Sequence, residues 1–304
     1  MFDRLPLELI KSIIEYAVTQ LLHSNRSSLV QLAQTSKGVY KILAPLLYHT
    51  IDASSHAAAF NRFLTNPRFR SLAQRILRHT RVLHIPRSER IHEYEAELLQ
   101  GVEELTTGTV SVILTLGRWW NSHRKVRGGT LNLRRLTVVL AGFEEFRLLP
   151  ASSTQWLTHV CAFGPVIDVG YHFASDPATW MRDILLLLPR LTHLGFNFWT
   201  RHRVTAIDLG PFSKAVRAAL TFDRLEVIAI RVTDSYHSMT FLKMLLDLED
   251  NRLRLWRDMG LGRHWMTAVC KGLRAEKTIW TEALPAQTLS AGASTGLQSQ
   301  FFVP

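Results

Sequence analysis

One spacing of apolar residues recurs along the chain and constrains its fold more than any other feature. Segments 188–196 and 222–230 both place apolar residues at positions one, four, seven and nine, and segment 157–162 is a weaker copy. The central positions Val160, Leu194 and Ile228 are evenly spaced along the chain. Because alternate side chains of a strand face one side of a sheet, this recurrence predicts an array of equivalent strands.

Helical patterns fall between these strands, at Ala178–Leu188, Pro211–Leu220 and Met239–Leu248. Segments 77–85, 133–139 and 253–255 look like further strands, and Trp265–Glu276 is typical of a closing helix. Alternation of strand and helix predicts parallel strands with right-handed crossovers. The spacing resembles that of leucine-rich repeats, with a longer period. We therefore expect an irregular leucine-rich-repeat-like α/β solenoid over residues 53–282, and a disordered tail, without charged residues, over 283–304.

The first fifty residues predict three short helices. The first carries Leu9, Ile10, Ile13 and Ile14 at helical spacing, Ser27 or Ser28 is a candidate cap for the second, and Pro45 interrupts the third. Leu29, Leu32, Ala33 and Ser36 are expected to line the second helix. Three helices of about ten residues cannot bury all of these large side chains among themselves. The surplus predicts contact with the rest of the chain or with another protein.

This segment resembles an F-box. The resemblance rests on Leu5-Pro6-x-Glu8-Leu9-Ile10, on Leu29-x-x-Leu32-Ala33-x-Thr35-Ser36-x-x-Val39-Tyr40 and on Pro45-Leu46-Leu47-Tyr48, an ending similar to that of fungal F-box families. It implies a three-helix F-box at residues 1–52, docked on a Skp-family adaptor and, through it, on a cullin. The implied adaptor-binding residues are Leu5, Pro6, Leu9, Ile10, Ile13, Leu29, Leu32 and Val39. The alternative is an N-terminal helical cap that buries its apolar face on the repeats.

The formal net charge of +11 lies almost wholly outside this N-terminal segment. Residues 1–60 carry a net charge of +1, whereas segments 62–90, 118–135 and 252–274 carry +7, +6 and +5. A basic partner face is predicted from Arg68, Arg70, Arg118, Arg124, Lys125 and Arg127. Three interpretations stay open at this point: a solvated surface, a site for an acidic protein substrate, and a site for nucleic acid.

No motif of an enzyme accompanies these features. The chain has no Gly-x-Ser-x-Gly, P-loop or His-Glu-x-x-His motif, and no spacing of metal ligands, so we expect no catalytic, cofactor or metal site. His159, His193 and His237 are expected to be core or rim side chains, although carboxylates such as Asp168, Asp208 and Asp234 leave a dispersed site open. No apolar run approaches the ~20 residues of a membrane span.

The two cysteines, Cys161 and Cys270, are typical of buried apolar positions in a cytoplasmic or nuclear protein. The sequence thus predicts a non-enzymatic substrate-recognition adaptor of a Skp–cullin–F-box ubiquitin ligase. The alternative is a basic repeat protein that binds nucleic acid or another acidic partner without assembling a ligase.

Overall fold

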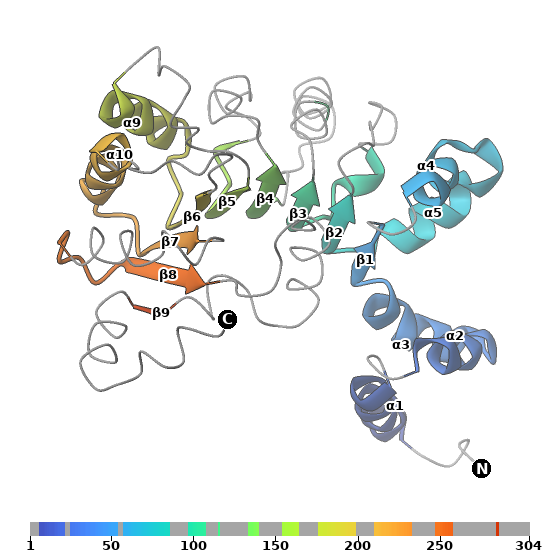
Figure 1. Ribbon diagram of the computed structural model, residues 1–304. Helices are drawn as coiled ribbons and strands as arrows, with labels where there is room; N and C mark the ends of the chain where they lie inside the picture. Colours follow the sequence, from blue (N-terminus) through green and yellow to red (C-terminus); the bar gives the residue numbers. More distant parts are fainter. Residues whose placement is uncertain are drawn as a thin grey trace, which may run out of the picture.

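The computed structural model describes residues 6–21, 25–53, 57–85, 97–107, 115, 133–139, 154–163, 176–198, 210–232, 247–257 and 284–285. The described strands form one open sheet in chain order, with β1 to β8 parallel and β9 antiparallel to β8 (Figure 1). The strands are β1 (Thr50–Asp52), β2 (Val82–Ile85), β3 (Glu104–Thr107), β4 (Arg135–Val139), β5 (His159–Phe163), β6 (His193–Phe198), β7 (Val227–Val232), β8 (Leu253–Arg257) and β9 (Leu284–Pro285). The predicted α/β class with parallel strands is confirmed.

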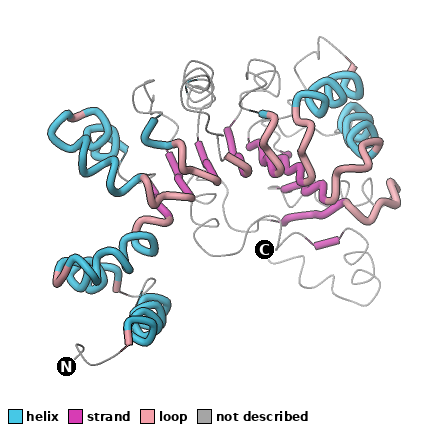
Figure 2. The backbone as a smooth tube through the Cα atoms, turned by 180° about the vertical axis from the view of Figure 1, so that it is seen from behind, coloured by secondary structure: helices cyan, strands magenta, loops and turns pink. Residues whose placement is uncertain are grey.

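Helices cover one face of the sheet, and a separate helical group extends beyond β1. Figure 2 shows the same arrangement from behind, with the strands in one curved row. The helices are α1 (Leu7–Leu21), α2 (Arg26–Gln34), α3 (Lys37–Leu47), α4 (Ala57–Thr65), α5 (Arg70–Leu77), α9 (Pro177–Leu187) and α10 (Gly210–Leu220), with 3₁₀ turns η2 (Pro67–Phe69) and η3 (Glu97–Leu99). Among the described residues, no helix is long and apolar enough to cross a bilayer.

One register position links all eight parallel strands. It is occupied in turn by Ile51, Leu83, Leu105, Leu136, Val160, Leu194, Ile228 and Leu253. All but Ile51 are fully buried in a core shared with α5, α9 and α10. The even spacing of Val160, Leu194 and Ile228 is confirmed as structural equivalence, while the step from Leu83 to Leu105 is much shorter. The number of residues per repeat therefore varies along the array, whereas the register of the strands is constant.

A backbone hydrogen-bond pattern also recurs where the strands begin. The carbonyl of His49 accepts hydrogen bonds from the N–H groups of both Arg81 and Val82, at 2.9 and 3.0 Å. The carbonyls of Arg81, Glu103, Arg134, Thr158 and Thr192 each accept two N–H groups from the following strand in the same way. Because this pairing recurs from β1 to β7, adjacent strands start at the same level, which fixes the register of the apolar row.

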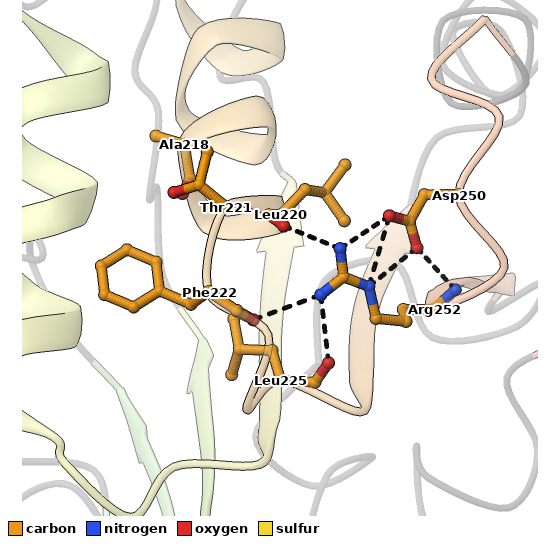
Figure 3. A network of polar contacts seen from close by, with 7 residues as sticks. All are labelled: Ala218, Leu220, Thr221, Phe222, Leu225, Asp250 and Arg252. Atoms are coloured by element: carbon orange, nitrogen blue, oxygen red, sulfur yellow. Dashed lines mark hydrogen bonds and ion pairs between the residues drawn. The ribbon is translucent and has the colours of Figure 1, made fainter.

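Arginines secure the ends of two helices. The Arg252 guanidinium donates to the Leu220 carbonyl at the end of α10 (2.7 Å) and to the carbonyls of Phe222 and Leu225 in the turn that follows (3.2 and 3.3 Å). It also pairs with Asp250 at 2.7 Å (Figure 3). Arg224 donates to the carbonyl of Leu185 near the end of α9. The bond to Leu220 satisfies a carbonyl at the end of α10, whereas the carbonyls of Leu185 and Phe222 also accept the backbone N–H groups of Leu188 and Leu225.

The three N-terminal helices have a core of their own, made of Ile14, Val18, Leu29, Ala33, Leu43 and Leu47. Several local details differ from expectation. Asn25, not Ser27 or Ser28, caps α2 by accepting from the Ser28 N–H at 3.2 Å. Ser36 caps α3 instead of lining α2, because its hydroxyl accepts from the Val39 N–H.

Pro45 does not interrupt the third helix. It lies inside α3, which continues to Leu47, and the Tyr48 N–H still reaches the Ala44 carbonyl at 3.0 Å. A proline this close to the end of a helix removes one hydrogen bond without displacing the turns that follow.

Other expectations are met in part. The helices expected at 178–188 and 211–220 are α9 and α10. Within the tail expected to be disordered, Leu284 and Pro285 instead pair with β8. The helix predicted at 265–276, and 239–246 of the segment predicted at 239–248, lie outside the described residues.

Candidate protein-interaction surface

Helix α1 carries apolar side chains on two of its faces. Ile14 and Val18 are buried in the helical core, with Ile10 partly buried beside them. Leu9, Ile13 and Tyr16 follow each other at steps of four and three residues, and their side chains are 47%, 45% and 71% exposed. Residues at this spacing lie on one face of a helix. We call Leu9, Ile13 and Tyr16 the α1 stripe.

Helix α2 adds Val30, which is 36% exposed, to the exposed apolar residues of this helical group. Single exposed apolar side chains are common on soluble proteins, but a row on one helix face is the arrangement used when one helix packs against a partner. Burying a large aliphatic side chain contributes roughly 1.5–3 kcal/mol. Because the three side chains of the α1 stripe are 45–71% exposed, a partner that covers them would gain part of this free energy at each position.

The residues implied by the F-box resemblance fall into different environments. Pro6, Leu9 and Ile13 are exposed, whereas Ile10, Leu32 and Val39 are partly buried against the helical core. Leu29 is fully buried, which corrects its assignment as an adaptor-binding residue: its side chain fills the core between α2 and its neighbours. Leu5 lies outside the described residues.

Tyr16 in the α1 stripe and Val30 on α2 are exposed but are not expected from the motif. The signal for Tyr16 is its position seven residues after Leu9, on the same helical face.

A row of ionisable side chains crosses the start of four neighbouring strands. Glu104 on β3 faces Arg135 on β4 at 3.6 Å, and the imidazoles of His159 on β5 and His193 on β6 stack with centroids 4.0 Å apart. The register pairs Glu104 with Arg135, Arg135 with His159 and His159 with His193. Parallel pairing in register therefore converts positions distant in sequence into one continuous polar row.

Burial sets the protonation of this row. It lowers the pKa of His159 to about 4, helped by the positive charges of His193 and Arg135. Burial also lowers the pKa of His193; Glu226 opposes this shift and Arg135 adds to it. The pKa of Glu104 is raised by burial, which Arg135 partly offsets. Both imidazoles are consequently neutral at pH 7.

Threonines orient both histidines. The Thr158 hydroxyl donates to the Arg134 carbonyl at 3.2 Å and lies 2.9 Å from Nδ1 of His159; Thr192 repeats the arrangement with the Thr158 carbonyl and His193, at 3.2 and 2.8 Å. Each threonine hydroxyl therefore connects a backbone carbonyl to Nδ1 of the histidine that follows it. The repeated triplet Leu-Thr-His at 157–159 and 191–193 is the sequence signal for this pair. The same hydrogen bonds thus repeat on neighbouring strands and hold both imidazoles in place, which is a structural role.

The polar row has no third histidine, cysteine or carboxylate placed to complete a metal site with the pair. Across the described residues, no group of three or more such side chains could hold an ion. His237, Asp168, Asp208 and Asp234, which the sequence left open as members of a dispersed site, lie outside the described residues.

Two members of the predicted basic partner face are described, and both are exposed. Arg68 lies in η2 and Arg70 begins α5, while Arg118, Arg124, Lys125 and Arg127 lie outside the described residues. The structure adds Arg62, Arg75 and Arg78, which are also exposed. These five exposed arginines lie on α4, on η2, on α5 and at the residue after α5.

No protein-family model, curated protein or solved structure matches the chain.

Proposed function

We propose that the chain is a substrate-recognition adaptor of a Skp–cullin–F-box ubiquitin ligase. In this proposal an F-box within residues 1–52 docks on a Skp-family adaptor, and the α/β array within residues 53–282 captures a protein substrate in the cytoplasm or nucleus. The observation that carries the proposal is the α1 stripe, in which Leu9, Ile13 and Tyr16 are exposed on one helix face. It falls within the segment whose sequence resembles an F-box.

The division of the molecule supports the same proposal. The helical core of α1, α2 and α3 contains none of the residues of the sheet core. In Figure 1 these three helices project from the β1 end of the sheet, away from α9 and α10. An adaptor that joins a ligase to a substrate needs two such separate surfaces. Its task is to position the substrate, and it performs no covalent chemistry itself.

The test is co-purification with a Skp-family adaptor. The full chain, co-expressed with the adaptor, is expected to elute as a soluble complex. Leu9 and Ile13 are about half exposed, so an adaptor can gain only about half of the free energy of full burial at each position. Replacing Leu9→Ser and Ile13→Ser together therefore removes roughly 0.7–1.5 kcal/mol at each, and we expect Kd to rise at least about tenfold. Both positions are exposed, and folding should be unaffected.

Leu186→Ser is the matched control, because Leu186 is 68% exposed on α9, a helix that lies far from α1 in Figure 1. It should bind the adaptor as the unmodified chain does. The proposal is wrong if the folded, unmodified chain does not bind the adaptor, or if the double variant binds with unchanged Kd.

A second candidate function is binding of nucleic acid or another acidic partner without a ligase. The observation in its favour is the exposed arginines of α4, η2 and α5. Binding to duplex DNA would weaken steeply with salt, with a slope of about 0.9 for each phosphate contacted. A gel-shift titration in which added salt has little effect would exclude this mode of binding.

A further inference from the structure

The α4–α5 region is the most strongly basic surface of the described structure. Between Asp52 and Glu89 the chain has no acidic residue, and this stretch contains seven arginines. Five of them are exposed on α4, η2, α5 and the residue after α5: Arg62, Arg68, Arg70, Arg75 and Arg78. No ion pair with a carboxylate satisfies any of these five in the described part of the chain, in contrast to Arg81, which pairs with Glu103 at 3.4 Å.

Two large apolar side chains lie among these arginines. Phe69 is 44% exposed and Leu72 is 37% exposed. They are three residues apart where η2 continues into α5, and Arg68 and Arg75 stand four residues before and three residues after Leu72. Leu72 and Arg75 therefore lie on one side of α5, and Arg68 and Phe69 directly precede this helix. We call these four side chains, together with the exposed Arg62, Arg70 and Arg78 of the same short region, the arginine face.

Local packing holds the arginine face in place. Phe63 on α4 contacts Phe69, with ring centroids 6.4 Å apart, and Asn66 caps η2 by accepting from the Arg68 N–H at 3.0 Å. On the opposite side of the same helices, Leu64, Ala73 and Leu77 are buried in the sheet core. The arginines are therefore presented from a backbone that the core fixes, which lowers the entropic cost of binding.

The positive field of this surface also affects a neighbouring side chain. The pKa of His79 is lowered, first by burial and then by the charges of Arg78 and Arg81. A group that carries negative charge would relieve the same repulsion.

We propose that the arginine face binds an acidic segment of a partner protein, one that carries apolar side chains among its aspartates and glutamates. Guanidinium groups bind carboxylates through paired hydrogen bonds, and aromatic and arginine side chains are enriched at protein interfaces. Nucleic acid fits less well: a base could stack on Phe69, but Leu72 has no aromatic face, so stacking would use only part of the apolar surface. Binding of an acidic segment does not depend on the ligase assignment. Only the identification of this partner as the captured substrate rests on the proposed function.

The test is fluorescence anisotropy of the full chain with three labelled probes. The first is a short acidic peptide, with leucine and phenylalanine spaced among aspartate and glutamate. The second is the same peptide with every acid replaced by its amide, and the third is a single-stranded oligonucleotide of equal length. We expect the acidic peptide to bind at least about tenfold more tightly than the amide peptide and the oligonucleotide.

Two variants carry the same change in charge. Arg68→Glu, Arg70→Glu and Arg75→Glu together should raise the Kd of the acidic peptide at least about tenfold. Arg182→Glu, Lys214→Glu and Arg217→Glu reverse three exposed charges on α9 and α10 and should leave it within about twofold. Leu72→Ala should weaken binding about threefold, while Leu186→Ala, at another exposed leucine, should have no effect.

Equal losses in the two charge variants would overturn the proposal, since net charge alone would then explain binding. The proposal is also overturned if the unmodified chain does not bind the acidic peptide. It is overturned as well if the oligonucleotide binds more tightly than the peptide and Leu72→Ala has no effect. Adaptor co-elution, measured on the same preparations, separates the two proposals. If the unmodified chain binds the adaptor but not the acidic peptide, this inference alone is refuted. If it binds the peptide but not the adaptor, the ligase assignment alone is refuted.

Discussion

His159 and His193 occupy equivalent positions on neighbouring strands, and each is held by the threonine that precedes it. Their charged forms are disfavoured by burial and by Arg135, while Glu226 favours the charged form of His193. The other charged group of the row, Glu104, faces Arg135. The stacked pair is therefore stable when neutral, and protonation works against the folded state.

This environment predicts how stability depends on pH. The pKa of His159 is about 4 in the folded chain and about 6.5 when unfolded, so its contribution to stability is complete above pH 6.5. As the pH falls from 6.5 toward 4, the His159 imidazole is protonated in the unfolded chain but stays neutral in the folded chain. The free energy of unfolding therefore decreases. We expect a loss of about 1 kcal/mol from this ring, after allowance for solvent screening.

The measurement is urea denaturation of the unmodified chain and of His159→Asn between pH 7 and pH 4.5. Asparagine keeps a polar amide at this position but does not titrate, so the stability of His159→Asn should fall less over this range. Parallel curves for the unmodified chain and His159→Asn would contradict the prediction.

At the scale of elements, Arg252 joins the start of β8 to the end of α10. Its side chain is 22% exposed and that of Asp250 is 20% exposed. The bond from Arg252 is the main cause that lowers the pKa of Asp250. Removing the guanidinium would leave a largely buried carboxylate and three carbonyls without this donor.

We therefore expect Arg252→Met to lower the free energy of unfolding by about 2–4 kcal/mol. Arg252→Lys should recover only part of this loss, since an ammonium group cannot reach the carboxylate and the carbonyls together. Arg217→Met, at an exposed position of α10, should change stability by less than about 0.5 kcal/mol. Chemical denaturation of the three variants tests this prediction. Equal midpoints for Arg252→Met and Arg217→Met would show that the Arg252 network contributes nothing to stability.

The elements that could be predicted from sequence are those with a strong local pattern. Strands β5, β6 and β7 repeat one spacing, and the segment before each strand has the same apolar positions. Strand β3 is not predicted, although Leu99, Val102 and Leu105 have the same spacing, because its last positions are the buried polar residues Thr106 and Thr107. Helices α4 and α5 escape prediction because each is short and its apolar residues are separated by arginines.

The surfaces were harder to predict than the elements. A motif names residue positions but does not say which face of a helix its neighbours leave open, so it assigns Leu29 to the surface and omits Tyr16. The polar row needs the sheet register, because nothing local to Glu104 or Arg135 indicates that they lie beside His159. The exposed arginines could be counted from the sequence, but not their grouping around Phe69 and Leu72.

At the scale of the whole molecule, the described residues form two cores that meet along the chain between α3 and β1. Tyr48 packs against the helical core, and Ile51 packs against the sheet core. The His49 carbonyl bonds to Arg81 and Val82, so the helical group is attached to the first strands by backbone hydrogen bonds as well as by chain continuity. Two cores without shared side chains are expected to unfold with a degree of independence.

Substitutions in the two cores should therefore act locally. Leu43 is fully buried in the helical core, and Leu194 is 1% exposed in the sheet core. Alanine at either position should therefore lower the free energy of unfolding by about 2–5 kcal/mol. Measured by hydrogen exchange with mass spectrometry, Leu43→Ala should speed exchange in α1, α2 and α3 while β5, β6 and β7 stay protected. Leu194→Ala should do the reverse, since a repeat array transmits destabilisation mainly to neighbouring strands.

Binding should divide in the same way. If the ligase assignment holds, Leu43→Ala weakens adaptor binding by loosening the α1 stripe, yet the arginine face still binds the acidic peptide. That combination separates loss of a docking surface from loss of the whole fold, which would abolish both. Faster exchange throughout the described elements in either variant would show instead that the two cores form one cooperative unit, and the helical group would then be an integral cap of the array.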